Sequence, residues 1–131
     1  MNDISKLDAA RFYARAWNTL DASVLESVLN DDVVMESQHV FEPLVGREAV
    51  LDYLTEKMET IQRSRSSVRI FAELGDVHGP DLQPCVIVAQ GQIDRLEAVV
   101  LFKVSGATIT RIDICVIPDP RSAKRSGEYP A

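Results

Sequence analysis

The sequence predicts a single α+β domain in which three N-terminal helices pack on a mostly antiparallel sheet. Apolar residues recur at the 3.6-residue spacing of helices in the first half of the chain, and after Ser64 they alternate with the two-residue period of strands. Short connections join the later strand candidates, which favours antiparallel neighbours. Helices that precede the main group of strands, instead of alternating with them, are typical of the α+β class.

Three helices are expected in the first half of the chain. The first has an apolar face over residues 9–20, with charged side chains on the opposite face. The second is short; Asp21 or Ser23 serves as its N-cap, and residues 24–29 supply its apolar face. The third and longest begins near Arg47, directly after a glycine.

Five strands are expected, one before the third helix and four after it. The four later candidates are rich in Val, Ile and Phe, and each of the five alternates between two faces. In the first strand, Met35, Ser37 and His39 share one face, and Glu36 lies on the other. The candidates span residues 33–41, 67–77, 84–93, 96–105 and 107–117.

The end of the chain differs in composition from the rest. Residues 118–131 contain prolines, a glycine and few apolar groups, so we expect them to form a flexible C-terminal tail. Residues 1–117 then form the domain. A chain of 131 residues can bury about two-thirds of its unfolded surface, so it needs no disulfide or metal to fold.

Charge and composition argue against two classes of partner. The formal net charge of −6 repels nucleic-acid phosphates, and basic residues gather in small groups only. The longest apolar runs, such as Ala98–Phe102, are far too short to span a bilayer, and the first residues lack the apolar core of a secretory signal. We therefore expect a cytoplasmic protein that contacts neither nucleic acid nor membrane.

The cysteines and histidines do not have the spacing of a metal site. Cys85 and Cys115 lie within apolar strand candidates, and we expect both to be buried reduced thiols. His39 and His78 are far from both in the sequence, whereas a structural zinc site needs clustered ligands. We expect no metal and no other cofactor.

Three segments and the order of the elements are similar to the NTF2-like superfamily, which includes ketosteroid isomerase and the SnoaL-like proteins. The segments are Tyr13–Asp21 at the first helix and its turn, Leu29–Ser37 leading into the first strand, and Gly46–Tyr53 at the start of the third helix. The resemblance covers residues 5–117. It implies a cystatin-like fold, in which a strongly curved, cone-shaped sheet closes on the helices around a small apolar pocket.

The same resemblance implies which side chains line the pocket. Trp17 and Tyr53 match pocket positions of the superfamily, and alternate residues of the last strand match its wall. Gln90 belongs to the set if its face of residues 84–93 turns inward, which the alternation leaves open. The expected ligand-binding residues are Trp17, Met35, Ser37, Tyr53, Gln90, Val100, Phe102, Ile112, Ile114 and Val116.

Catalytic groups, if the protein is an enzyme, are expected at Tyr13 and His39. Tyr13 matches the tyrosine that stabilises an oxyanion in ketosteroid isomerase, and a tyrosine hydroxyl is a donor up to about pH 10. Ser37 and Val100 stand where that enzyme has its two acids, which argues against its chemistry here. His39 is then the best general base, because an imidazole titrates near neutral pH. Its place near a strand end also fits a surface histidine.

Two carboxylates of the strands have an orientation that depends on register. Glu36 and Asp113 point away from the pocket if the alternation holds. A slip of one residue would turn both inward and create an acid pair.

Three functions remain open on these observations. The first is a cofactor-free enzyme of isomerase, cyclase or hydrolase type, acting by acid/base chemistry on an apolar, cyclic, polyketide- or steroid-like molecule. The second is a non-catalytic domain that binds such a molecule, and the third is a dimerisation module with a filled pocket. Val99 and Leu101, on the outer phase of the fourth strand, favour a homodimer through the outer sheet face in all three cases.

Overall fold

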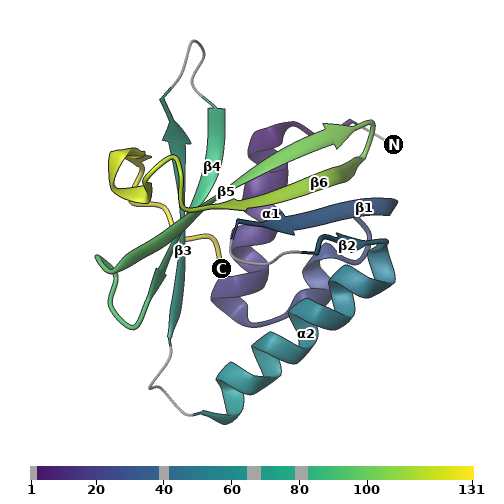
Figure 1. Ribbon diagram of the computed structural model, residues 1–131, viewed down its shortest axis with the longest axis horizontal. Coiled ribbons are helices and arrows are strands. Elements are labelled where there is room, and N and C mark those ends of the chain that lie inside the picture. Colours follow the sequence, from purple (N-terminus) through teal and green to yellow (C-terminus); the bar gives the residue numbers. More distant parts are fainter. Residues whose placement is uncertain (1–2, 39–41, 65–68, 79–82) are drawn as a thin grey trace.

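The computed structural model describes residues 3–38, 42–64, 69–78 and 83–131. In these residues two α-helices pack on one face of a curved, seven-stranded mixed sheet (Figure 1). In chain order the elements are α1 (Lys6–Thr19), the 3₁₀ turn η1 (Ala22–Leu25), β1 (Leu29–Ser37), β2 (Leu44–Val45), α2 (Arg47–Arg63), β3 (Ile70–Val77), β4 (Gln83–Gln90), β5 (Leu96–Ser105), β6 (Thr108–Cys115), the 3₁₀ turn η2 (Pro120–Ser122) and β7 (Lys124–Arg125).

The described residues form two α-helices where the sequence predicted three, so that prediction is wrong. The expected second helix is η1, one 3₁₀ turn whose N-cap Asp21 accepts a hydrogen bond from the N–H of Ser23. The chain cannot continue as a helix, because the carbonyl of Val28 accepts a hydrogen bond from the N–H of Ile109 in β6 at 2.7 Å. The chain therefore joins the sheet at Leu29, earlier than the expected start of this strand at residue 33.

The sheet has the strand order β2-β1-β6-β5-β4-β3-β7. β1 runs parallel to β6, and every other neighbouring pair is antiparallel. The register shifts within the pairs β1–β6, β4–β5 and β5–β6. Bulges of this kind bend a strand and increase its twist, which accounts for the curvature of the sheet.

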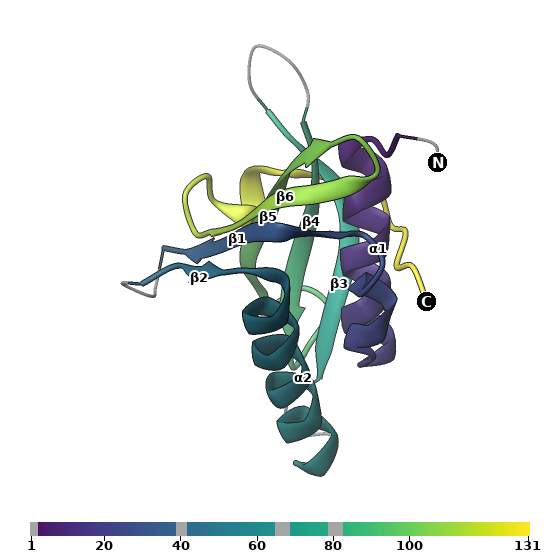
Figure 2. The same ribbon diagram turned by 90° about the vertical axis from the view of Figure 1, so that its right-hand side faces the viewer.

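The main core lies between the helices and one face of the sheet, which we call the inner face. α1 packs against β3, β4 and β5, and α2 packs against β1 (Figure 2). The largest fully buried side chains of this core include Tyr13, Leu25, Leu54 and Phe102. Burial of such side chains stabilises the fold by about 1.5–3 kcal/mol each.

A second, smaller cluster lies on the opposite or outer face. It contains Cys85, Ile87, Val99 and Cys115, with Ala123 packed against them. Both cysteines are free and buried, and burial raises the pKa of the Cys85 thiol to about 12. Val99 is 0% exposed within the single chain, so its burial does not require a second copy.

The C-terminal segment, residues 118–131, is packed on the sheet and differs from the expected flexible tail. β7 pairs with β3, and beyond it the N–H of Ser126 donates to the carbonyl of Leu74 at 3.1 Å. The N–H of Leu74 in turn donates to the carbonyl of Glu128 at 2.9 Å. The segment therefore provides hydrogen-bond partners for β3, which the predicted fold left as an edge strand. Main-chain groups make these contacts, so the side-chain pattern of the segment, with its few apolar residues, did not indicate that it packs on the sheet.

Candidate functional site

A partly open cavity of about 340 Å³, which we call the internal cavity, lies between α1, α2 and the inner face of the sheet. This volume is on the scale of sites that hold small molecules. The walls are mostly apolar, and polar groups enter from both the helices and the strands. The lining residues are Tyr13, Trp17, Met35, Ser37, Tyr53, Leu54, Lys57, Ile70, Val88, Gln90, Glu97, Ala98, Val100 and Ile114.

The structure brings many of the expected site residues to this cavity and places others elsewhere. Phe102 and Ile112 are on the inner face, but they are buried in the core and do not line the cavity. Val116 follows β6, and its N–H donates to the side-chain oxygen of Gln38 at 2.7 Å. His39 lies outside the described residues. The expected residues that line the cavity are Tyr13, Trp17, Met35, Ser37, Tyr53, Gln90, Val100 and Ile114.

Tyr13 places a buried hydroxyl in the cavity wall. The residue is 2% exposed, and its ring packs edge-on against Phe102 at 5.4 Å and Trp17 at 6.5 Å between centroids. Burial raises the pKa of Tyr13 well above its ordinary value of 10, and a hydrogen bond with Trp17 opposes the shift in part. The hydroxyl therefore remains a hydrogen-bond donor throughout the physiological range.

Gln90 comes from the strand whose inward face the sequence could not decide. Val86 and Val88 lie in or against the main core, whereas Cys85 and Ile87 belong to the outer cluster. Gln90 continues the inner phase, pairs with Ile70 on β3, and lines the cavity with it. Its amide supplies a donor and an acceptor at this side of the cavity.

Two charged residues of the wall were missed from the sequence. Lys57 lies one turn after Tyr53 on α2, and its ammonium sits 5.3 Å from the centroid of that ring. The four-residue spacing could have indicated this contact. Glu97 sits in β5 next to Leu96, where regular alternation would place it on the outer face with Val99. The sequence carries no signal for its inward position, because a bulge causes it.

Two further hollows adjoin the cavity. The larger, of about 450 Å³, shares five residues with it and adds exposed residues of α2, so it forms the solvent side of the site. The shared residues are Trp17, Tyr53, Lys57, Ile70 and Gln90. The smaller, of about 70 Å³, lies between Met35, Leu44 and Tyr53 and includes Glu42.

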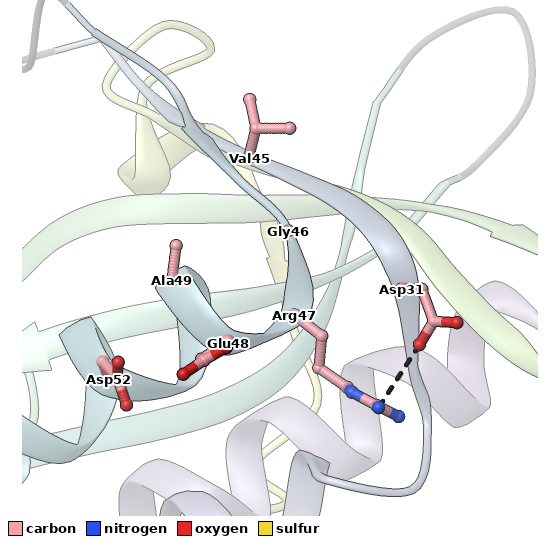
Figure 3. Close-up of a pocket in the computed structure, with 7 residues that line it drawn as sticks. All are labelled: Asp31, Val45, Gly46, Arg47, Glu48, Ala49 and Asp52. Carbon is pink, nitrogen blue, oxygen red and sulfur yellow. Dashed lines mark ion pairs between the residues drawn. The ribbon is translucent and has the colours of Figure 1, made fainter.

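A separate hollow of about 600 Å³ lies at the start of α2 (Figure 3). Its charged side chains are exposed, and Arg47 forms an ion pair with Asp31 at 3.3 Å. This hollow is larger than the internal cavity, but it is open surface with no buried polar group. The internal cavity is therefore the better candidate for a binding site.

The acid pair that a register slip would have created does not form. β1 and β6 pair with Glu36 opposite Asp113, and both carboxylates bind Arg111 on the outer face. The Nε atom of Arg111 lies 3.0 Å from a carboxylate oxygen of Asp113. Arg111 partly neutralises the two carboxylates, and the group lies away from the cavity and plays no part in its chemistry.

The described part of the chain contains neither a metal-binding cluster nor a membrane-spanning helix. In residues 3–38, 42–64, 69–78 and 83–131, no group of three or more His, Cys, Asp or Glu side chains is placed to hold a metal ion. The helices of the described residues are too short or too polar to cross a membrane.

The fold and the sequence together define the class of protein. A model of the SnoaL-like domain matches residues 9–112, so the chain belongs to the SnoaL-like domain family. Among curated proteins, no significant relative was found.

Solved structures with the same fold have low sequence identity to this chain. A cystatin-fold protein from Novosphingobium aromaticivorans is 16% identical, with a TM-score of 0.60 over 86% of this chain and 98% of that one. A provisionally assigned ketosteroid isomerase from Kribbella flavida is 22% identical, with a TM-score of 0.59 over 83% and 75%. A provisionally assigned polyketide cyclase from Sinorhizobium meliloti is 18% identical, with a TM-score of 0.56 over 79% and 90%. At these identities the similarity establishes the fold alone.

Proposed function

We propose that this SnoaL-like domain binds a small, largely apolar molecule in its internal cavity. The observation that carries the proposal is the buried Tyr13 hydroxyl in the wall of a cavity of about 340 Å³. Apolar side chains such as Met35, Val100 and Ile114 surround the rest of the space. A ligand with a ring-sized apolar body and one hydrogen-bond acceptor, such as a carbonyl, matches this arrangement.

The proposed ligand class is cyclic, of polyketide or steroid type. The provisional assignments of the Kribbella and Sinorhizobium proteins support this class only by analogy of fold. The cavity supports it physically, because the aromatic side chains of Trp17 and Tyr53 in its lining suit flat or ring-shaped molecules.

A second candidate function is cofactor-free acid/base catalysis of isomerase, cyclase or hydrolase type. Tyr13 favours it, because a donor that stays protonated can stabilise negative charge that develops on a bound oxygen. His39 remains the base predicted from the sequence. Once a turnover is found, His39→Gln tests this role, and turnover within about threefold of wild type would exclude it.

Fluorescence of Trp17 offers a direct test of binding. It is the sole tryptophan of the sequence and lines the cavity, so a bound molecule should change its emission. We expect adamantan-2-one, a compact ring ketone, to change the emission saturably. Tyr13→Phe should weaken this binding by about 0.5–1.5 kcal/mol, because one neutral hydrogen bond is lost.

A filled cavity provides the control for this measurement. Ala98→Leu places extra methyl groups into the cavity wall and should abolish binding of the ketone. Ala123→Leu, on the outer face, should leave binding unchanged. No saturable signal with wild-type protein at millimolar ketone would contradict the proposal and favour the alternative of a non-binding homodimerisation module.

A further inference from the structure

A β-bulge in β5 determines where Glu97 points. Val88 of β4 pairs with Ala98, but the next residue, Ala89, pairs with Leu96. Glu97 is therefore an extra residue without a partner on β4. Leu96 packs on the outer cluster, whereas Ala98 lines the cavity, so the bulge lets Glu97 and Ala98 face the same side.

The bulge places the carboxylate of Glu97 in the cavity lining, whereas regular strand alternation would place it on the outer face. Of the described residues that line the cavity itself, Glu97 is the one acidic side chain. Its side chain is 47% exposed, and its ion pair with Arg95 is long, at 3.7 Å, and exposed to solvent. Such an exposed ion pair contributes only about 0–1 kcal/mol to stability. The carboxylate of Glu97 can therefore leave Arg95 and bind a proton or a ligand group instead.

Tyr13 and Glu97 reach the same cavity from different elements. Tyr13 belongs to α1 and offers a hydrogen-bond donor in a buried part of the cavity wall. Glu97 belongs to β5 and lies nearer to the solvent. Ser37 and Val100, which stand where ketosteroid isomerase has its two acids, carry no carboxyl group. A donor for developing negative charge and an acceptor for a proton are the two groups that proton abstraction from carbon requires.

We propose that Glu97 is the proton acceptor of this site and acts on a carbon acid bound in the cavity beside Tyr13. The C–H bond next to a carbonyl breaks, the proton passes to a carboxylate oxygen of Glu97, and the electron pair moves onto the carbonyl oxygen. That oxygen accepts a hydrogen bond from Tyr13. The proton later returns from Glu97 to a carbon of the bound anion, which restores the carbonyl group and the carboxylate. This inference rests on the proposed function and names a residue that performs it.

The probe 5-nitrobenzisoxazole tests this role without knowledge of the natural substrate. A base takes the proton from C3, the C–H pair completes the C≡N bond, and the N–O bond breaks with its pair left on the phenolate oxygen. The coloured phenolate reports the rate. We expect wild-type protein to catalyse this elimination and Glu97→Gln to lower kcat by about 100-fold or more, with KM within about threefold.

Two further variants separate the role of Glu97 from general effects. Glu97→Asp keeps a carboxylate and should retain part of the activity. Glu59→Gln removes a carboxylate from the exposed side of α2 and should leave kcat unchanged. Glu97 is half exposed, so each variant should fold, and equal thermal unfolding midpoints verify this.

Binding of 5-nitrobenzotriazole, which has the shape of the probe without its reactive C–H, is measured by calorimetry. If this analogue binds but no elimination occurs, or if Glu97→Gln retains kcat within about threefold, the inference about Glu97 is wrong and the proposed binding function stands. If the analogue does not bind and no elimination occurs, the proposed function and the inference both fail.

Discussion

At the scale of single residues, burial decides the chemistry of the site more than residue type does. Tyr13 and Tyr53 both line the cavity, but Tyr13 is 2% exposed and Tyr53 is half-buried. Burial disfavours the charged phenolate and so raises the pKa of Tyr13. Tyr13 therefore ionises less easily in the folded protein than in the unfolded chain. This difference makes the stability of the protein depend on pH in the alkaline range.

We predict that the free energy of unfolding falls at alkaline pH because of Tyr13. Its pKa is raised by burial, so above about pH 10 the unfolded chain loses this proton while the folded chain keeps it. The stability present below that pH is then lost by about 1.4 kcal/mol per pH unit until the folded state also ionises. Tyr13→Phe should remove this loss. The measurement is urea unfolding between pH 8 and 11, at steps of about half a pH unit.

The buried thiols titrate in the same range and need a control. The pKa values of Cys85 and Cys115 are also raised, first of all by burial. Both thiols are present in wild type and in Tyr13→Phe, so the difference between the two proteins isolates the tyrosine. Parallel pH profiles in the two proteins would mean that Tyr13 ionises as easily folded as unfolded.

At the scale of elements, the C-terminal segment protects the edge of the sheet. Glu73 on β3 is 3% exposed, and its carboxylate oxygens accept hydrogen bonds from Arg125, from the N–H of Gly127 and from the hydroxyl of Tyr129. Arg125 also binds Asp94 in the turn between β4 and β5. The buried carboxylate is therefore satisfied by the segment, and the segment in turn holds a turn that lies next to Gln90 and Glu97.

We predict that Gly75→Ala detaches this segment while the rest of the domain stays folded. A Cβ atom at Gly75 would lie 2.6 Å from the carbonyl oxygen of Lys124 and from a methyl group of Ile87. The methyl group can move, but the main chain of β7 cannot do so without losing its pairing. Hydrogen exchange should become faster at the N–H groups of Leu74 and Ser126, which now bond across the two segments.

A second glycine distinguishes detachment from a general loss of stability. Gly106 has a φ of 56° and open space around its Cβ position, so Gly106→Ala introduces backbone strain far from β7. It should lower global stability without selective exchange at Leu74 and Ser126. Unchanged protection of these two amides in Gly75→Ala would show that β7 is held by contacts other than the close approach at Gly75.

At the scale of the whole molecule, sequence periodicity predicted the sheet better than it predicted the site. Residues 96–105 were expected as a strand and form β5 with those bounds, because long alternating runs leave little choice. The prediction of a second helix was wrong, because the end of that segment depends on where β1 joins β6. The pairing of the C-terminal segment with β3 was not predicted, because it depends on main-chain hydrogen bonds. Glu97 was missed for a similar reason: a bulge depends on the pairing of two strands and has no signal in one of them.

The homodimer through the outer face remains a proposal, and the structure restricts where such an interface would lie. Val99 is covered within its own chain, and Ala123 packs against its cluster. Leu101, the other residue that favoured a dimer, is half-buried and pairs with Asp113 beside the Arg111 ion pairs. An interface would therefore centre on β5 and β6 near Leu101.

We predict that Leu101→Arg converts a dimer into a monomer, since it places a charge at the centre of this apolar and ion-paired surface. Sedimentation equilibrium at micromolar concentration measures the change. Thr55→Arg, which adds the same charge to the exposed side of α2, should leave the dimer intact. A wild-type protein that sediments as a monomer, or a Leu101→Arg variant that remains dimeric, would exclude this face as the interface. In either case the cavity on the inner face keeps its lining, because every residue assigned to it belongs to one chain.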